Sequence, residues 1–210
     1  MSHILPKDSS QMMDWSWNNY IPFFDYLADF DLTSENVSEW MKYWSNLSEL
    51  IGEVGTSVYV ATTVDTTDEE AKSRYHKFLE EISENVGSRN QLLKIKFLKS
   101  QVSPDNFDIP LRGIKSEVEL FSEDNLPLLT SDAKLSKEYD AIIGSQTVTW
   151  DDEEVTLTQL SPVMLETDRD KRERAWRLAS NRRLKDRKPI NEIWEKVLKI
   201  RMSIAKNSDY

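Results

Sequence analysis

The longest amphipathic segment of this chain reads SENVSEWMKYWSNLSELIGEVGTSVYV, residues 34–60. Its apolar side chains recur every three or four residues, which places them on one face of an α-helix. They are Val37, Trp40, Met41, Trp44, Leu47, Leu50, Ile51 and Val54. Thr33 or Ser34 can cap the start of this helix. Because no turn signal follows residue 60, we expect the helix to continue into the β-branched run YVATTV, residues 59–64.

A second long helical stretch follows a short acidic turn. In the turn DTTDEE (65–70), Thr66 or Thr67 can cap a helix, and the acids suit the positive end of its dipole. An apolar stripe then continues through Ala71, Tyr75, Phe78, Leu79, Ile82, Val86, Leu93, Phe97 and Leu98. One helix, or two separated at Gly87, ends before Pro104. The two stretches predict a long antiparallel helical hairpin.

Shorter elements are expected on both sides of this hairpin. Residues 12–30 are rich in aromatic side chains, but Pro22 argues against one continuous helix, so we expect residues 1–33 to form an extended aromatic arm that leads into a turn. Short helices are expected at 111–121 and 131–143, separated by NLPLL (125–129). The runs QTVTW and EVTL predict one small β-hairpin at about residues 146–157.

The last part of the chain predicts two more helices. Thr167 can cap the first, with Asp170 in the reciprocal capping position, and Pro189 suits the start of the second. The expected fold is therefore mainly α with one β-hairpin. We divide it into an arm (1–33), a helical N-terminal domain (34–145), and the hairpin with its following helices (146–210).

Composition restricts the class of protein. Seven Trp and 39% hydrophobic residues indicate a folded globular chain, and the lack of cysteine excludes disulfides, thiolate zinc sites and a cysteine nucleophile. The sequence contains neither a signal-peptide pattern nor an apolar run of roughly 20 residues, so we expect a cytoplasmic protein without a membrane partner. Residues 165–210 carry fourteen basic against eight acidic residues. The acids stand at helical spacing among the arginines, which indicates an ion-paired helix face and no nucleic-acid partner.

Catalytic motifs are missing. The two histidines, His3 and His76, do not form the His-Glu-x-x-His pattern of zinc hydrolases, so we interpret His76 as structural. There is no Gly-x-Ser-x-Gly motif and no glycine-rich phosphate loop. The acidic run 151–154 lacks the alternating ligands of a calcium loop, and we interpret it as a solvated turn. We assign no catalytic residue and no metal ligand to this chain.

Nine short strings, in this order, resemble the oligoendopeptidase F branch of the thimet-oligopeptidase-like zinc metallopeptidases. They are DTTDEEA (65–71), NLPL (125–128), LSKEY (135–139), TVTWD (147–151), EEVTL (153–157), TDR (167–169), RERAW (172–176), DR (186–187) and LKIR (198–201). One departure is Asp152, where the family has a glycine in its hairpin turn. Asp tolerates left-handed backbone geometry, so we expect the hairpin to form.

The resemblance implies the N-terminal portion of a longer enzyme. Family members are more than twice this length, and their helical halves enclose a channel that binds short unstructured peptides. Their zinc ligands lie in the later half, where the metal activates water and polarises the scissile carbonyl. None of those ligands maps onto this chain. We therefore expect a channel wall that is inactive alone, with the catalytic region and oligopeptide substrates as partners and zinc bound only by the complete enzyme.

Four residues are candidates for the interface with that catalytic region: Trp150, Arg169, Arg172 and Trp176. The alternative is that they serve only the core of this chain. The final helix has no stop signal, so we expect the polypeptide to continue beyond residue 210. Two other functions stay open, a stand-alone helical module that binds peptides or proteins, and a complete enzyme that uses carboxylates alone.

Overall fold

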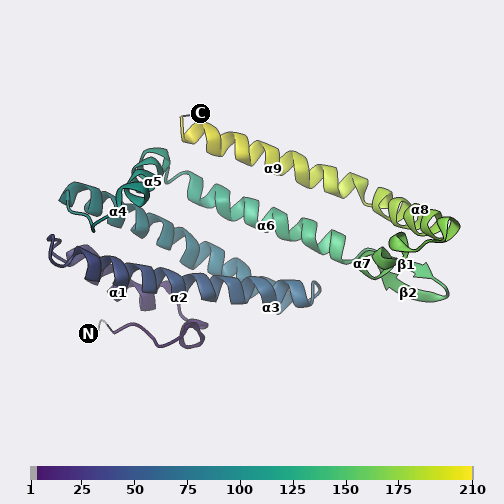
Figure 1. The fold of residues 1–210 in the computed structure, drawn as a ribbon, viewed down its shortest axis with the longest axis horizontal. Coiled ribbons are helices and arrows are strands. Elements are labelled where there is room, and N and C mark those ends of the chain that lie inside the picture. The colour runs from purple at the N-terminus through teal and green to yellow at the C-terminus, as the bar shows by residue number, and fades with distance from the viewer. Residues whose placement is uncertain (1–3, 210) are drawn as a thin grey trace. The chain divides into compact units, whose positions relative to one another are not determined.

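The computed structural model describes residues 4–209 and is mainly α-helical with one two-stranded antiparallel sheet, which confirms the expected fold class (Figure 1). The helices are α1 (Trp17–Asp29), α2 (Val37–Val64), α3 (Glu69–Lys77), α4 (Glu84–Ser100), α5 (Asp108–Leu120), α6 (Asn125–Gly144), α7 (Leu157–Leu160), α8 (Arg169–Lys185) and α9 (Arg187–Asn207). The strands are β1 (Thr147–Trp150) and β2 (Glu153–Thr156). Short 3₁₀ segments are η1 (Ser9–Met12) and η3 (Ser161–Leu165), and η2 (Phe78–Ser83) is a π-helical segment.

The chain divides into two compact units, residues 1–130 with 203–210, and residues 131–202. These limits differ from the divisions after residues 33 and 145 that the sequence suggested. Residues 12–30 contribute to the same core as α2, and the first boundary falls inside α6. No helix among residues 4–209 is both long and apolar enough to cross a membrane.

The core of the first unit is built on α2, as its apolar periodicity predicted. Trp40 is almost fully buried, and its indole Nε1 donates a hydrogen bond to the carbonyl oxygen of Leu27 at 2.9 Å. The helix continues through residue 64, as expected, but it begins at Val37. The expectation that Thr33 or Ser34 caps it is wrong, because Asn36 precedes the first helical residue and its side chain accepts from the N–H of Thr33 at 2.8 Å.

The second long helical stretch runs without a break from α3 through η2 into α4, and Gly87 does not interrupt it. Thr66 and Thr67 do not cap α3. Asp68 occupies that position, and its carboxylate accepts from the N–H of Ala71 at 2.9 Å. Thr67 donates from both its N–H and its hydroxyl to Asp65, and these bonds lower the pKa of the Asp65 carboxyl.

The expectation of an extended aromatic arm is wrong, because residues 17–29 form α1 with Pro22 inside it. Proline in a helix interior costs about 3 kcal/mol. The same helix buries Tyr20, Phe24 and Leu27, and each such side chain contributes about 1.5–3 kcal/mol. Burial of this face therefore outweighs the cost of the proline.

The expectation that NLPLL separates two helices is also wrong. This segment forms the first turn of α6, which begins at Asn125. Pro127 is the third residue of that helix, where a backbone N–H has no partner within the helix. The break lies before it, between α5 and residue 125.

The second unit contains the β-hairpin and the helices that cover it. Trp150 pairs with Glu153, and the two turn residues Asp151 and Asp152 have φ angles of 51° and 68°. Positive φ at both central residues is the requirement of a type I′ turn, so the expectation that the hairpin tolerates Asp152 is confirmed. The hairpin packs with α7, η3 and α8 around the buried residues Leu160, Ala175 and Ala179.

Candidate functional site

The four residues predicted from the sequence lie in the second unit, on α8 and at the end of β1. The structure separates them into two kinds. Trp150 and Arg172 make contacts inside this unit, whereas Arg169 and Trp176 are exposed.

Trp150 is held between the hairpin and α8. Its ring is partly buried against the cluster around Leu160. The guanidinium carbon of Arg174 lies 4.2 Å from the centre of that ring, and Arg174 Nη1 also lies 3.0 Å from Asp151 Oδ1. A cation over an indole at this distance contributes about 0.5–1 kcal/mol at an exposed site. Trp150 therefore joins the turn to the helix, and the sequence alone did not indicate its partner.

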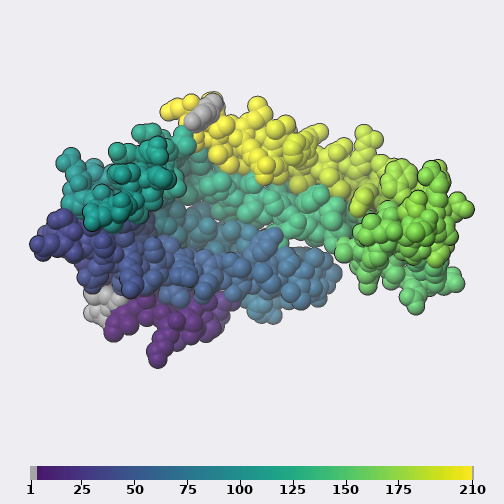
Figure 2. Space-filling model, viewed as in Figure 1, coloured from purple at the N-terminus to yellow at the C-terminus, as the bar shows by residue number. Residues whose placement is uncertain are grey.

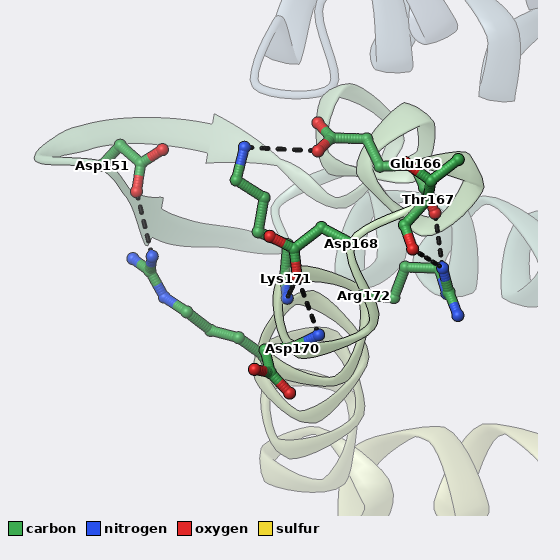
Figure 3. Close-up of polar contacts among 8 residues, drawn as sticks. Asp151, Glu166, Thr167, Asp168, Asp170, Lys171 and Arg172 are labelled. Carbon is green, nitrogen blue, oxygen red and sulfur yellow. Dashed lines mark hydrogen bonds and ion pairs between the residues drawn. The ribbon is translucent and has the colours of Figure 1, made fainter.

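The N-terminus of α8 is fixed by a group of polar contacts (Figure 3). Asp168 caps the helix, since its Oδ1 accepts from the N–H groups of Asp170 at 2.9 Å and Lys171 at 3.1 Å. The predicted Thr167 cap is wrong, because the residue directly before the first helical position is Asp168. Thr167 instead provides a backbone carbonyl that accepts from Arg172 Nη1 at 2.9 Å.

Arg172 therefore has a structural role. The same Nη1 also donates to the carbonyl oxygen of Glu166 at 2.6 Å, so one guanidinium holds the loop that enters α8. Lys171 adds an ion pair with the Glu166 carboxylate at 3.3 Å. Arg172 is half-buried.

Arg169 and Trp176 line a shallow hollow of about 460 Å³ beside α8. Trp176, at the edge of this hollow, is 58% exposed. The other residues that line the hollow are Met164, Arg169, Arg172, Glu173 and Arg177. Tryptophan and arginine are the residues most enriched at the energetic centres of protein interfaces. This surface, defined by the six residues named here, is called the α8 hollow below.

α9 carries a row of exposed apolar side chains that the sequence pattern did not distinguish from its buried ones. The side chains of Ile193 and Val197 are buried against Leu135. Trp194, Leu198 and Met202, which stand four residues apart, face outwards, and Trp194 is 60% exposed. The surface of α9 is drawn in yellow in Figure 2. These three residues are called the α9 stripe.

The two helices that carry these surfaces are strongly basic. Residues 169–202 contain thirteen Lys and Arg against five Asp and Glu. An apolar stripe and a basic hollow with a tryptophan edge suit a partner surface that combines apolar side chains with carboxylates.

Two further polar contacts anchor this unit. The buried Gln146 donates from Nε2 to Asp186 Oδ2 at 2.8 Å, and this hydrogen bond, together with Arg182, lowers the pKa of the Asp186 carboxyl. Arg201 donates from Nε and Nη2 to both oxygens of Asp132, at 3.0 and 3.2 Å. The Gln146–Asp186 and Arg201–Asp132 contacts join residues that lie 40 and 69 positions apart in the chain.

The arrangement of potential metal ligands bears on a metal centre. Within residues 4–209, no group of three or more His, Asp or Glu side chains could hold a metal ion. His76 is half-buried on α3 beside Tyr75, and His3 lies outside the described residues. The residues present therefore do not fit the zinc site that the family resemblance implies for the complete enzyme.

Three solved structures have a similar fold. PZ peptidase A, solved with an inhibitor, matches 100% of this chain with a TM-score of 0.77 and 22% identity. A protein described as an oligoendopeptidase F from Bacillus anthracis strain Ames matches 99% of the chain, with a TM-score of 0.72 and 20% identity. A further oligoendopeptidase F structure matches 97%, with a TM-score of 0.73 and 20% identity. No protein-family model and no curated protein sequence matches the chain.

The likeness confirms, at the level of the fold, the resemblance drawn from the nine sequence strings. It extends to the aromatic segment before residue 34, which the strings did not cover. The chain spans only 37%, 38% and 36% of the three matched chains.

Proposed function

We propose that this chain is the N-terminal, non-catalytic portion of a cytoplasmic, zinc-dependent oligoendopeptidase that hydrolyses short peptides. In this proposal it forms a wall of the peptide channel and is inactive alone. The observation that carries the proposal is the match of nearly the whole chain to little more than a third of peptidase structures. The ordered sequence strings that resemble the oligoendopeptidase F branch support it independently.

The α8 hollow and the α9 stripe are the proposed contact with the catalytic region. Exposed tryptophans on two neighbouring helices favour a surface that is covered in the complete protein. The basic character of these helices favours carboxylates on the opposing surface. Zinc would be held by the catalytic region, since residues 4–209 contain no group of side chains that fits such a site.

Reconstitution tests the proposal. The gene downstream of codon 210 is sequenced, and the encoded region that contains His-Glu-x-x-His is expressed separately. Each part alone is expected to leave quenched fluorescent oligopeptides intact, and the mixture is expected to hydrolyse them in a reaction that a chelator stops. A well-folded pair that forms a complex and stays inactive contradicts the proposal, as does a downstream frame without a metal motif.

Charge reversal then tests the contact surface. Arg169→Glu is expected to weaken reconstitution, because it places a carboxylate in the α8 hollow against the proposed acidic partner surface. Arg183→Glu is the matched control, since Arg183 is also exposed on α8 but does not line the hollow. Equal loss with both variants would indicate a dependence on net charge and would remove the α8 hollow from the interface.

A stand-alone helical module that binds peptides or proteins is the second candidate. It is favoured by the core of the first unit, where Trp40 and Trp44 both satisfy their indole N–H groups with partners of the same unit. It predicts a stop codon after Tyr210 and a monodisperse chain with one cooperative unfolding transition. A chain that aggregates until the catalytic region is added favours the first candidate.

A further inference from the structure

The first unit contains a pocket of about 120 Å³ between η1, α1, α2 and the helical stretch that begins with α3. Its interior is apolar and includes the buried side chains of Met12, Val54, Val58 and Ile82. This volume is slightly smaller than an apolar protein cavity of about 150 Å³ that holds benzene. The interior therefore has room for a branched aliphatic or small aromatic group.

One buried polar group lies among these apolar walls. Tyr20 lines the pocket and is fully buried, and its hydroxyl has no hydrogen-bond partner among residues 4–209. Burial raises the pKa of Tyr20 to about 12, so the hydroxyl is neutral and can both donate and accept. An unpaired buried hydroxyl costs about 1–3 kcal/mol. A ligand group within hydrogen-bond distance of this hydroxyl would remove that cost.

Charges of both signs surround the opening. Arg74 and Lys77 come from α3, whereas Asp14 and Glu81 come from the segment before α1 and from η2. All four are exposed residues. Arg74 forms an exposed pair with Glu70 at 3.2 Å, while Asp14, Lys77 and Glu81 form no ion pair with any described residue. The opening thus presents two cations and two anions around an apolar interior.

The backbone of one wall is irregular at this place. Phe78, Glu81 and Ile82 line the pocket from the π-helical segment η2. Such segments are rare and frequently occur at functional sites. Opposite them, Gly55 allows the ring of Phe78 to approach α2, since a Cβ atom at Gly55 would lie 2.9 Å from Phe78 Cε1. The glycine therefore sets where this wall of the pocket stands.

We propose that this pocket binds a free α-amino acid with an apolar side chain. The carboxylate would face Arg74 and Lys77, the ammonium group would face Asp14 and Glu81, and the side chain would fill the interior. The Tyr20 hydroxyl would pair with one of the two polar ends. A ligand with both charges and an apolar group matches the three chemical features of the site, whereas a simple anion or cation would meet two like charges.

Calorimetric titration of the 210-residue chain with L-leucine tests the proposal. Leucinamide lacks the carboxylate, N-acetyl-leucine lacks the ammonium group, and isobutanol lacks both. L-leucine is expected to bind at least about tenfold more tightly than either derivative, which corresponds to about 1.4 kcal/mol for each lost charge contact. Equal affinity for leucine and isobutanol would reduce the site to an apolar cavity and overturn the proposal. The absence of leucine binding at any soluble concentration would also overturn it.

Variants locate the site. Arg74→Gln and Glu81→Gln are each expected to weaken leucine binding about tenfold, and Tyr20→Phe to weaken it several-fold. The matched controls are Arg112→Gln and Glu119→Gln, exposed residues of α5 outside the pocket. Circular dichroism of each variant identifies any loss of folding. If Tyr20→Phe unfolds, the test rests on Arg74→Gln and Glu81→Gln, which change exposed residues. Unchanged affinity in both folded charge variants would refute the assignment. The readout is binding to this chain alone, so it is independent of reconstituted peptidase activity.

Discussion

The guanidinium of Arg174 covers the indole of Trp150 at 4.2 Å, and this contact joins the β-hairpin to α8. The same side chain reaches Asp151 at the turn of the hairpin. Trp150 is thereby part of the internal packing of its unit. Trp176, two residues after Arg174, points to solvent from the same helix.

This contrast predicts effects of very different size on stability for two Trp→Ala substitutions. Trp150→Ala is expected to lower the free energy of unfolding by about 2 kcal/mol or more, because it removes partly buried aromatic surface and the cation contact. Trp176→Ala is expected to change it by less than about 0.5 kcal/mol, because the ring is largely exposed. Urea unfolding monitored by circular dichroism measures both. A large loss with Trp176→Ala would mean that this ring supports the core.

The hairpin turn gives a second prediction. Asp152 has a φ of 68°, a conformation that costs an ordinary L-residue about 1–2 kcal/mol and glycine almost nothing. Asp152→Gly is therefore expected to raise the free energy of unfolding by about 0.5–1 kcal/mol, after the added flexibility of the unfolded chain is allowed for.

Asp152→Val is the companion variant, since a β-branched residue is disfavoured at positive φ. It is expected to destabilise the same unit. Thermal unfolding of the wild type and both variants tests whether stability falls from Asp152→Gly through the wild type to Asp152→Val. A Val variant as stable as the wild type would show that the turn changes its conformation.

The sequence predicted the helices best where one face is buried along its whole length. The face of α2 that contains Trp40, Leu47 and Val54 is buried, so its period of 3.6 residues is visible in the sequence. The caps were less predictable, because neighbouring threonines and aspartates have similar preferences. Asp68 and Asp168 have the capping role that the threonines before them were expected to have.

The candidate site was predictable only in part. The string RERAW marks α8, but which of its side chains face inwards depends on the hairpin, whose Trp150 is 24 residues before Arg174 in the chain. The pocket beside Tyr20 was not visible in the sequence, because Asp14 comes from the segment between η1 and α1, whereas the other rim charges come from α3 and η2. Only the fold brings these segments together. Pro22 led to the wrong prediction for residues 17–29. The cost of this proline is offset by burial of α1 against the rest of its unit, and tertiary packing of this kind is not visible in the local sequence.

Replacement of this proline is the third prediction. Pro22→Ala restores a donor to the interior of α1 and removes the clash with the preceding turn, so we expect stabilisation by about 1–3 kcal/mol. Pro189→Ala is the matched control, because Pro189 is the third residue of α9 and its missing N–H has no partner within the helix. The control is expected to change stability by less than about 0.5 kcal/mol. Chemical denaturation compares them, and destabilisation by Pro22→Ala would mean that the proline ring itself is required by the core.

Two glycines of α2 provide the fourth prediction. A Cβ atom at Gly52 would meet nothing within 4 Å, so Gly52→Ala is expected to stabilise the chain by about 0.5–1 kcal/mol. At Gly55 the added Cβ would stand 2.9 Å from the ring of Phe78, which must move. Gly55→Ala is therefore expected to gain less stability than Gly52→Ala or to lose it. Thermal unfolding of the pair measures the difference, and equal gains would mean that Phe78 moves without cost.

The last prediction concerns acid. The hydrogen bond from Gln146, with a contribution from Arg182, holds the pKa of Asp186 below its ordinary value of 3.8. A carboxyl whose pKa is lower in the folded than in the unfolded chain contributes stability that is fully present above the unfolded pKa. That contribution is lost as the pH falls from about 5 through the lower folded pKa.

Carboxyl-carbon NMR titration of Asp186 measures this pKa directly. Gln146→Ala is expected to raise it towards 3.8, and Arg182→Gln to raise it less, because the Gln146 hydrogen bond is the largest cause of the shift. In Asp186→Asn the fall in stability on acidification is expected to be smaller than in the wild type, since the variant residue does not titrate. A wild-type Asp186 that titrates at or above 3.8 would contradict the role given to the Gln146 hydrogen bond.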